Sequence, residues 1–220
     1  MNPLRHDFIN SCFASYPSAP HQKRYLDIGC GGGIFAESAA RLPRTARVLA
    51  IDPSTEVIDV AKQHARSDPH LMDPGRLVYE NKSIEDLAAP SSADEQFDVV
   101  SLFEVIEHID RPSAFLENCL PFVRPGGWLV LSTIARTWTS WLTTKVVAEE
   151  VVRMVPRGTH QWEKYINADE LQGWFAKREG WGAGGGVRLM GVVYVPGLGW
   201  RVVPTGERWG NYFFGIRKDV

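Results

Sequence analysis

Two carboxylates and an imidazole are spaced closely enough in this sequence to act on one ligand. Glu104, Glu107 and His108 follow an apolar run at residues 97–103. In a helix they would stand at positions i, i+3 and i+4, on one face of one turn. Such a set suits a hard divalent cation that also binds water and substrate oxygens, or a general base with its orienting partner. The alternative is a solvated helix start in which His108 is incidental.

A glycine-rich turn precedes this segment in the chain. Gly29, Gly31, Gly32 and Gly33 follow a short apolar run and open a predicted helix. Glycines allow close approach of a ligand to the backbone, and a helix start offers unpaired N–H groups. The spacing Gly29-x-Gly31-x-Gly33 is compatible with a dinucleotide fingerprint, and equally with a tight strand-to-helix turn.

Acidic residues beside the glycines distinguish between cofactors. Asp52 ends the second predicted strand, where a carboxylate can bind the ribose hydroxyls of NAD or of S-adenosylmethionine (SAM). Asp27 directly precedes the glycines, where a carboxylate repels a pyrophosphate and attracts the ammonium of a methionine moiety. These charges favour SAM over NAD. After the third predicted strand, Ile84 would stack on the adenine and Ser83 would present its backbone N–H, unless this segment is a plain loop with a helix cap.

The elements that must position these groups alternate between strand and helix. Apolar runs without alternation predict strands covered on both faces, and the order of elements predicts a doubly wound, mostly parallel sheet. The expected strands are residues 23–28, 46–51, 76–79, 97–103, 128–133, 187–195 and 212–216, the last two as an antiparallel hairpin at the sheet edge. The expected helices are residues 33–42, 54–65, 111–123, 138–154 and 167–177, with caps at Ser54 or Thr55 and at Asn167 with Glu170.

Composition narrows the class of protein. The chain has 220 residues, of which 44% are apolar and 23% charged, with a net charge of −2. These values predict one globular α/β domain and exclude disorder, collagen and coiled coil as the main state. The near-neutral charge and the lack of a Lys/Arg run argue against nucleic acid as a partner. Cys12, Cys30 and Cys119 form no CxxC pair, which indicates a reducing compartment.

Residues 138–154 are expected to form an amphipathic helix that carries Trp138 and Trp141 beside Lys145 and Arg153. Tryptophans with basic residues suit a membrane interface, whereas a helix that covers the core would show a similar pattern. No apolar run in the sequence approaches the roughly 18 to 20 residues of a membrane span. A soluble or peripheral intracellular protein is therefore expected.

Together these residues resemble the class I SAM-dependent methyltransferases. They are more closely similar to the ubiquinone biosynthesis O-methyltransferase family, in its fungal mitochondrial form. The matching segments are residues 2–5 (NPLR), 26–33 (LDIGCGGG), Glu104-x-x-Glu107-His108, residues 125–127 (PGG), 132–134 (STI) and 155–162 (VPRGTHQW). The glycine motif marks only the superfamily, whereas VPRGTH and the leading NPLR are much more specific. Family members carry a segment before NPLR, with paired tryptophans, that this sequence is expected to lack.

The resemblance implies an activity: SAM-dependent O-methylation of a phenolic hydroxyl on polyprenylated catechols, namely polyprenyl-dihydroxybenzoate and demethylubiquinol. It also implies the sites. By the resemblance SAM would be bound by Arg5, Gly29, Asp52 and Phe103, and the residue patterns add Asp27, Gly31, Ser83 and Ile84. Glu104, Glu107 and His108 would hold magnesium or another divalent cation. From the residues themselves, Glu107, His108 and His160 are the candidate catalytic groups: His108 or His160 could be the base in place of a metal, and His160 could equally be structural.

The resemblance further implies a peripheral position on the matrix side of the mitochondrial inner membrane, within a ubiquinone-biosynthesis protein complex. The expected fold is a single class I methyltransferase domain over residues 1–220, Rossmann-like, with seven strands and an antiparallel last strand. Residues 1–22 would be an N-terminal helix, 23–135 the SAM-binding core, 136–185 a substrate- and membrane-facing helical insertion, and 186–220 the closing strands.

Other functions stay open on the residues alone. One is a metal-free methyltransferase acting on another small molecule, and a second is a non-catalytic SAM-binding scaffold subunit. An NAD oxidoreductase with the same fold is disfavoured by Asp27, for the electrostatic reason given above.

Overall fold

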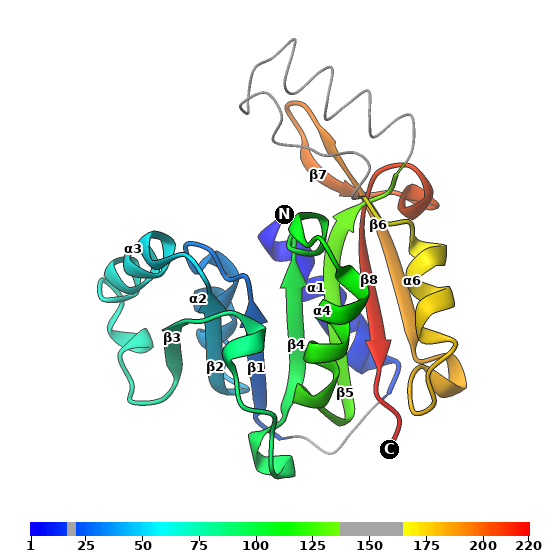
Figure 1. Ribbon diagram of the computed structural model, residues 1–220. Helices are drawn as coiled ribbons and strands as arrows, with labels where there is room; N and C mark the ends of the chain where they lie inside the picture. Colours follow the sequence, from blue (N-terminus) through cyan, green and yellow to red (C-terminus); the bar gives the residue numbers. More distant parts are fainter. Residues whose placement is uncertain (17–20, 137–164) are drawn as a thin grey trace.

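A mostly parallel sheet organises the chain in the computed structural model, which describes residues 1–16, 21–136 and 165–220 (Figure 1). Five strands are parallel: β1 (Lys23–Ile28), β2 (Thr45–Asp52), β3 (Leu77–Asn81), β4 (Phe97–Phe103) and β5 (Val123–Ile134). Antiparallel pairing adds β6 (Val187–Val195), β7 (Gly199–Val202) and β8 (Asn211–Arg217). The order across the sheet is β3-β2-β1-β4-β5-β8-β6-β7. The predicted α/β fold is thereby confirmed.

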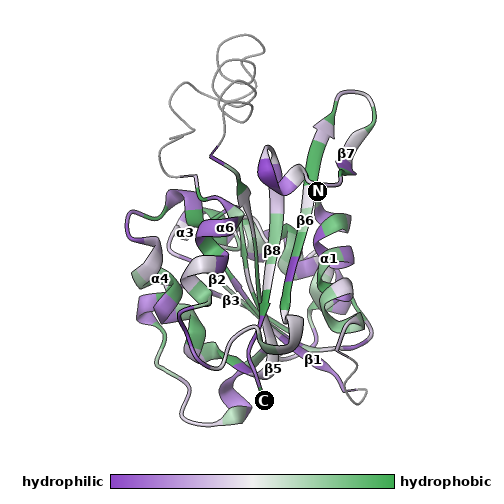
Figure 2. Cartoon of the chain, turned by 90° about the vertical axis from the view of Figure 1, so that its right-hand side faces the viewer, coloured by the Kyte–Doolittle hydropathy of each residue, from purple (hydrophilic) through white to green (hydrophobic). Residues whose placement is uncertain are grey.

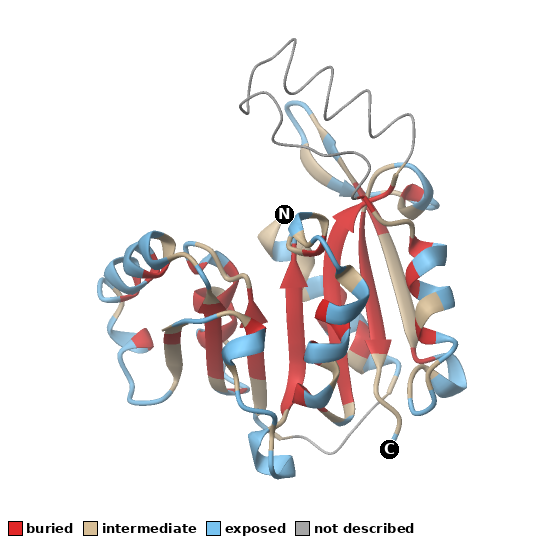
Figure 3. Cartoon of the chain, in the orientation of Figure 1, coloured by how far each residue is buried: buried red, intermediate tan, exposed pale blue. Residues whose placement is uncertain are grey.

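Two features of the sheet differ from the prediction. The described residues form eight strands rather than seven, because the four-residue strand β7 pairs with the end of β6. The last strand in the chain, β8, does not lie at the edge but between β5 and β6. Its residues 212–216 are all buried, since both of its faces and both of its edges are covered (Figure 3).

Helices cover both faces of this sheet, as Figure 2 shows with α1 on one side and α4 and α6 on the other. One core contains side chains of α1 (Asn2–Ala14), α2 (Ile34–Ala40) and α3 (Thr55–Ala65). The other contains side chains of α4 (Pro112–Cys119) and α6 (Ala168–Phe175). The predicted cap Ser54 and the predicted capping box of Asn167 with Glu170 are both present.

The predicted helix over residues 111–123 is shorter in the structure. α4 ends at Cys119, a 3-10 turn follows at Leu120–Phe122, and β5 already begins at Val123. Pro121 explains the change, because proline has no N–H to donate and therefore does not continue an α-helix. Another predicted helix, over residues 138–154, lies outside the described residues.

The carboxyl ends of the parallel strands meet at one edge of the sheet, and ligands of open α/β sheets bind at that edge. α1 brings Arg5 to the same edge, because the Arg5 side chain lies 3.9 Å from that of Glu104, the residue after β4; Figure 1 shows the N-terminus at this end of the sheet. α6 packs on the sheet through its buried residues Ala168, Leu171 and Phe175. Among the helices that the structure describes, none combines the length and apolar character that a bilayer crossing requires.

Candidate cofactor and active site

Backbone hydrogen bonds fix the conformation of the glycine turn after β1. The N–H groups of Gly29 and Cys30 donate to the carbonyl of Ile51 at 2.9 and 3.0 Å, which ties the turn to β2. Gly29, Gly31 and Gly33 all have positive φ, a conformation that favours glycine. A Cβ at Gly29 would lie 2.5 Å from a side-chain methyl of Val105, whereas one at Gly31 would meet nothing within 4 Å. The space above Gly31 is therefore open to a ligand.

The carboxylate of Asp52 is fixed at the tip of β2. One of its oxygens accepts from the N–H of Gly31 at 3.0 Å, and the other accepts from the N–H of Ser54 at 2.9 Å. Asp52 is only partly buried. A carboxylate oxygen accepts more than one hydrogen bond, so both oxygens keep capacity for hydroxyl donors. This arrangement suits the binding of a ribose.

Asp27 is a carboxyl buried beneath the glycine turn, with 3% of its surface exposed. Ser101 on β4 donates its hydroxyl to Asp27 Oδ1 at 2.7 Å. Burial raises the pKa of Asp27 to about 7, a rise that Asp52 adds to and that Ser101 and Arg5 oppose. A carboxyl held in this way gains from a cationic ligand, because a cation stabilises its charged form.

Arg5 reaches this carboxyl end of the sheet from α1. Its guanidinium lies 4.8 Å from the ring centroid of Phe103, and its Nη2 lies 3.9 Å from Glu104 Oε2. The Nε atom of Arg5 is buried and has no hydrogen-bond partner among the described residues. Phe103 itself is buried and packs edge-on against Phe35, with ring centroids 4.7 Å apart. An unpaired guanidinium donor next to Asp27 suits a ligand that carries both an ammonium and a carboxylate.

The segment after β3 adopts the capped loop that was the alternative to an adenine contact. The N–H and the hydroxyl of Ser83 both donate to Asp86 Oδ2, at 2.8 and 2.9 Å. Ile84 is buried in the core, with 2% of its surface exposed. In this conformation neither group is presented to a ligand, so their contact with an adenine stays a prediction.

Residues 104–108, after β4, do not form the helical turn that the sequence predicts. Glu104 has a φ of 60°, in the left-handed region, and the following 3-10 turn covers only Ile106–His108. The chain therefore bends sharply at Glu104, and its carboxylate faces Arg5. Glu107 instead accepts a hydrogen bond of 3.0 Å from Thr133 on β5. Residues 104–108 do not form one helical face, because no helical turn spans them.

The predicted magnesium ligands do not converge. Among the residues that the structure describes, no group of three or more His, Cys, Asp and Glu side chains could hold a metal ion. Glu104 and Glu107 have different partners, and His108 is exposed. In this arrangement the three side chains do not form a cation site, so their binding of a divalent cation stays a prediction. His160, the third predicted catalytic residue, lies outside the described residues.

Glu107 has an environment suited to proton transfer. Burial raises its pKa to about 7, against the hydrogen bond from Thr133, and the charge of Glu104 adds to the rise. A carboxyl with a pKa near the working pH can both accept and release a proton. Sequence reasoning missed Thr133 and Ser101, the hydroxyl donors of Glu107 and Asp27. Each could have been noticed as a polar residue near the carboxyl end of a mostly apolar strand.

Comparisons with known proteins show the family of the chain. A family model described as a methyltransferase domain matches residues 5–180. The chain is 44% identical over 194 residues to a Candida albicans protein named ubiquinone biosynthesis O-methyltransferase, mitochondrial, covering 88% of this chain and 57% of that protein. It is 38% identical over 223 residues to the Nitrobacter winogradskyi ubiquinone biosynthesis O-methyltransferase, covering 95% of this chain and 74% of that protein.

Among solved structures, the plantazolicin methyltransferase BpumL in complex with SAH matches with a TM-score of 0.66 and 16% identity. The match covers 97% of this chain and 81% of that one, and it shows a shared fold. The chain spans little more than half the length of the Candida relative.

Proposed function

The chain belongs to the ubiquinone biosynthesis O-methyltransferases, and from this premise we propose that it methylates a phenolic hydroxyl of polyprenylated catechols with SAM as methyl donor. The acceptors would be the dihydroxybenzoate and demethylubiquinol intermediates of ubiquinone synthesis. The observation that carries the proposal is the buried carboxyl of Asp27 beside an open glycine turn. A methionine ammonium would supply the cation that this carboxyl lacks, whereas a pyrophosphate would be repelled.

In the proposed complex each cofactor-binding residue takes one part of SAM. Asp52 binds the ribose hydroxyls, and the absence of a side chain at Gly31 lets the cofactor approach the backbone closely. Asp27 and Arg5 bind the ammonium and the carboxylate of the methionine moiety. Bound SAM supplies an electrophilic methyl group. Holding it in line with the acceptor oxygen contributes most to the rate, up to roughly 7 to 11 kcal/mol of the barrier.

The acceptor oxygen must also lose a proton. Glu107 is the group we assign to this step, because its pKa is raised to about 7 and it lies at the carboxyl end of β4. A phenol has a pKa of about 10, about 3 units above that of Glu107, so transfer of its proton to Glu107 costs roughly 4 kcal/mol. Thr133 orients the carboxylate for this role. His108 and His160 remain candidates for the same step.

The resemblance also implies magnesium as a cofactor. The described residues offer no three-ligand site, so metal assistance is tested directly. Methylation of a catechol is measured in buffer with EDTA and after addition of Mg²⁺. Loss of activity in EDTA that Mg²⁺ restores would establish metal assistance, and unchanged activity would favour the metal-free alternative.

We further propose a peripheral position on the matrix side of the mitochondrial inner membrane, in a ubiquinone-biosynthesis complex. The supporting observation is the mitochondrial name of the fungal relative. The predicted helix over residues 138–154 would make the membrane contact. Flotation with liposomes tests this: replacement of Trp138 and Trp141 should abolish binding, and unchanged flotation would remove the proposal.

The central experiment is transfer of a labelled methyl group from SAM to a short-chain polyprenyl-dihydroxybenzoate. We expect one methyl ether per turnover with the unaltered chain and none with Asp27→Ala. Asp94→Ala is the matched control, because Asp94 is exposed near the start of β4, at the opposite end of the sheet. SAM binding without transfer to any catechol would favour the non-catalytic scaffold subunit.

A further inference from the structure

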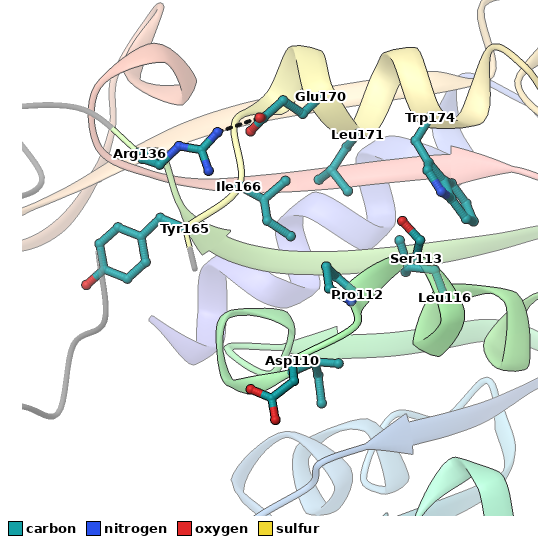
Figure 4. A pocket seen from close by; sticks show the side chains of 11 residues that line it. Asp110, Pro112, Ser113, Leu116, Arg136, Tyr165, Ile166, Glu170, Leu171 and Trp174 are labelled. Carbon is teal, nitrogen blue, oxygen red and sulfur yellow. Dashed lines mark hydrogen bonds and ion pairs between the residues drawn. The ribbon is translucent and has the colours of Figure 1, made fainter. Parts of the chain in front are cut away.

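A cavity of about 350 Å³ opens between α4 and α6, on the face of the sheet opposite α1 (Figure 4). This volume falls within the roughly 300 to 1,000 Å³ of small-molecule sites. Apolar side chains make up much of its lining: Ile109, Pro112, Leu116, Ile166, Leu171 and Trp174. None of the residues assigned above to SAM lines this cavity.

The wall formed by the start of α6 is fixed by hydrogen bonds. Asn167 accepts from the backbone N–H of Arg136 at 2.8 Å, which ties the start of α6 to the end of β5. The carbonyl of Ile166 accepts from the hydroxyl of Tyr212 on β8 at 2.6 Å. Three elements therefore hold this side of the cavity, and it does not need a ligand to form.

A second contact, an ion pair, joins the two helices beside the lining residue Trp174. Arg178, just after α6, forms an ion pair with Glu117 on α4. The guanidinium of Arg178 lies 3.2 Å from the ring centroid of Trp174, a lining residue, which restricts the motion of that indole. The separation of α4 and α6 around the cavity is thus set by contacts at both ends of α6.

Three charged side chains line the cavity: Asp110, which is exposed, and the pair of Arg136 and Glu170. Arg136 and Glu170 line the cavity and pair with each other at 2.5 Å, as the dashed line in Figure 4 shows. A charged ligand would have to compete with this pair for either partner. An apolar chain makes no such demand and gains free energy from burial against the six apolar side chains.

The cavity borders the turn that carries Glu107. Ile109 lines it two residues after Glu107, and Arg136 lines it three residues after Thr133, the donor to Glu107. A ligand in the cavity would therefore reach the end of the turn that carries the group assigned to the acceptor proton. We propose that this cavity binds the isoprenoid chain of the methyl acceptor, an inference that rests on the proposed function.

Ser113 offers a way to fill the cavity without touching the core, because it lines the cavity and is exposed. Ser113→Trp should lower kcat/KM for a catechol with a three-unit isoprenoid chain by about 10-fold, or about 1.4 kcal/mol. For a catechol without the chain, kcat/KM should change less than 2-fold. Ala114→Trp is the matched control, since Ala114 is the next residue of α4, exposed and outside the lining. It should leave both substrates unaffected.

Equilibrium dialysis with labelled farnesol separates this inference from the proposed function. The unaltered chain and Ala114→Trp should bind farnesol saturably, and Ser113→Trp should bind it at least 10-fold more weakly. That pattern in a protein that methylates no catechol would support the cavity while removing the proposed function. Equal farnesol binding by all three proteins would overturn the inference, as would an equal loss of activity on both catechols in Ser113→Trp.

Discussion

Replacing Asp27 with asparagine is expected to stabilise the protein without ligand at pH 8. The pKa of Asp27 is raised from 3.8 to about 7 by burial. The folded state therefore keeps a proton that the unfolded state releases, and stability falls as the pH rises from about 4 to 7. A pKa raised by about 3 units lowers the free energy of unfolding by about 4 kcal/mol at pH 8. The neutral amide of Asp27→Asn would carry no such cost, and its oxygen could still accept the hydrogen bond from Ser101.

Urea denaturation at several pH values measures this difference. Asp27→Asn should match the unaltered protein near pH 4, and its advantage should grow to a maximum of about 4 kcal/mol above pH 7. Asp94→Asn controls for the loss of a carboxylate elsewhere. The same Asp27→Asn variant should bind SAH more weakly, because the ammonium loses its counter-charge. An Asp27→Asn protein that is less stable at pH 8, or whose difference does not change with pH, would refute this account of Asp27.

Three further predictions concern single side chains of the site. Glu107→Gln should lower kcat at least 100-fold and remove the fall of activity below about pH 7. A pH–rate profile measures both effects, and a fall of activity that persists in Glu107→Gln would assign the proton of the acceptor hydroxyl to another group. Arg5→Ala should raise the Kd for SAH about 10-fold in calorimetry, whereas Arg5→Lys should raise it less; an unchanged Kd in Arg5→Ala would remove Arg5 from the cofactor site. Gly33→Ala should lower the melting temperature, because its Cβ would lie 2.1 Å from the hydroxyl oxygen of Tyr79. Adding Tyr79→Phe to Gly33→Ala should recover part of the loss, and an unchanged melting temperature in Gly33→Ala would refute this packing argument.

Much of the fold could be predicted from local patterns. The runs KRYLDI and FDVVSLF predict β1 and β4 to the residue. FDVVSLF has the nearly continuous apolar pattern of a parallel strand that is buried on both faces. The caps at Ser54 and Asn167 follow from side chains that bond within one helical turn. β7 escaped detection because four residues, GWRV, carry too short a pattern. The position of β8 depends on long-range pairing with β5 and β6 that no local pattern encodes.

The candidate site could be predicted only in part. The sequence places Asp27, Asp52 and the glycines at the carboxyl ends of β1 and β2, as the structure does, and their binding of a cofactor stays a prediction. The turn at residues 104–108 was misjudged because i, i+3 and i+4 spacing implies a shared face only in a helix, and Glu104 lies in the left-handed region instead. A bend of this kind is set by the tertiary hydrogen bond from the Glu104 N–H to the carbonyl of Ser132, at 3.0 Å.

Mass spectrometry of the product formed from a short-chain polyprenyl catechol and SAM with a trideuterated methyl group tests the proposed methylation directly. We expect a catechol that is heavier by one labelled methyl group, attached to a phenolic oxygen, in an amount that falls to background in Asp27→Ala. Binding of SAH with no labelled ether from any catechol would contradict the proposed methylation and identify the chain as a SAM-binding protein without that activity.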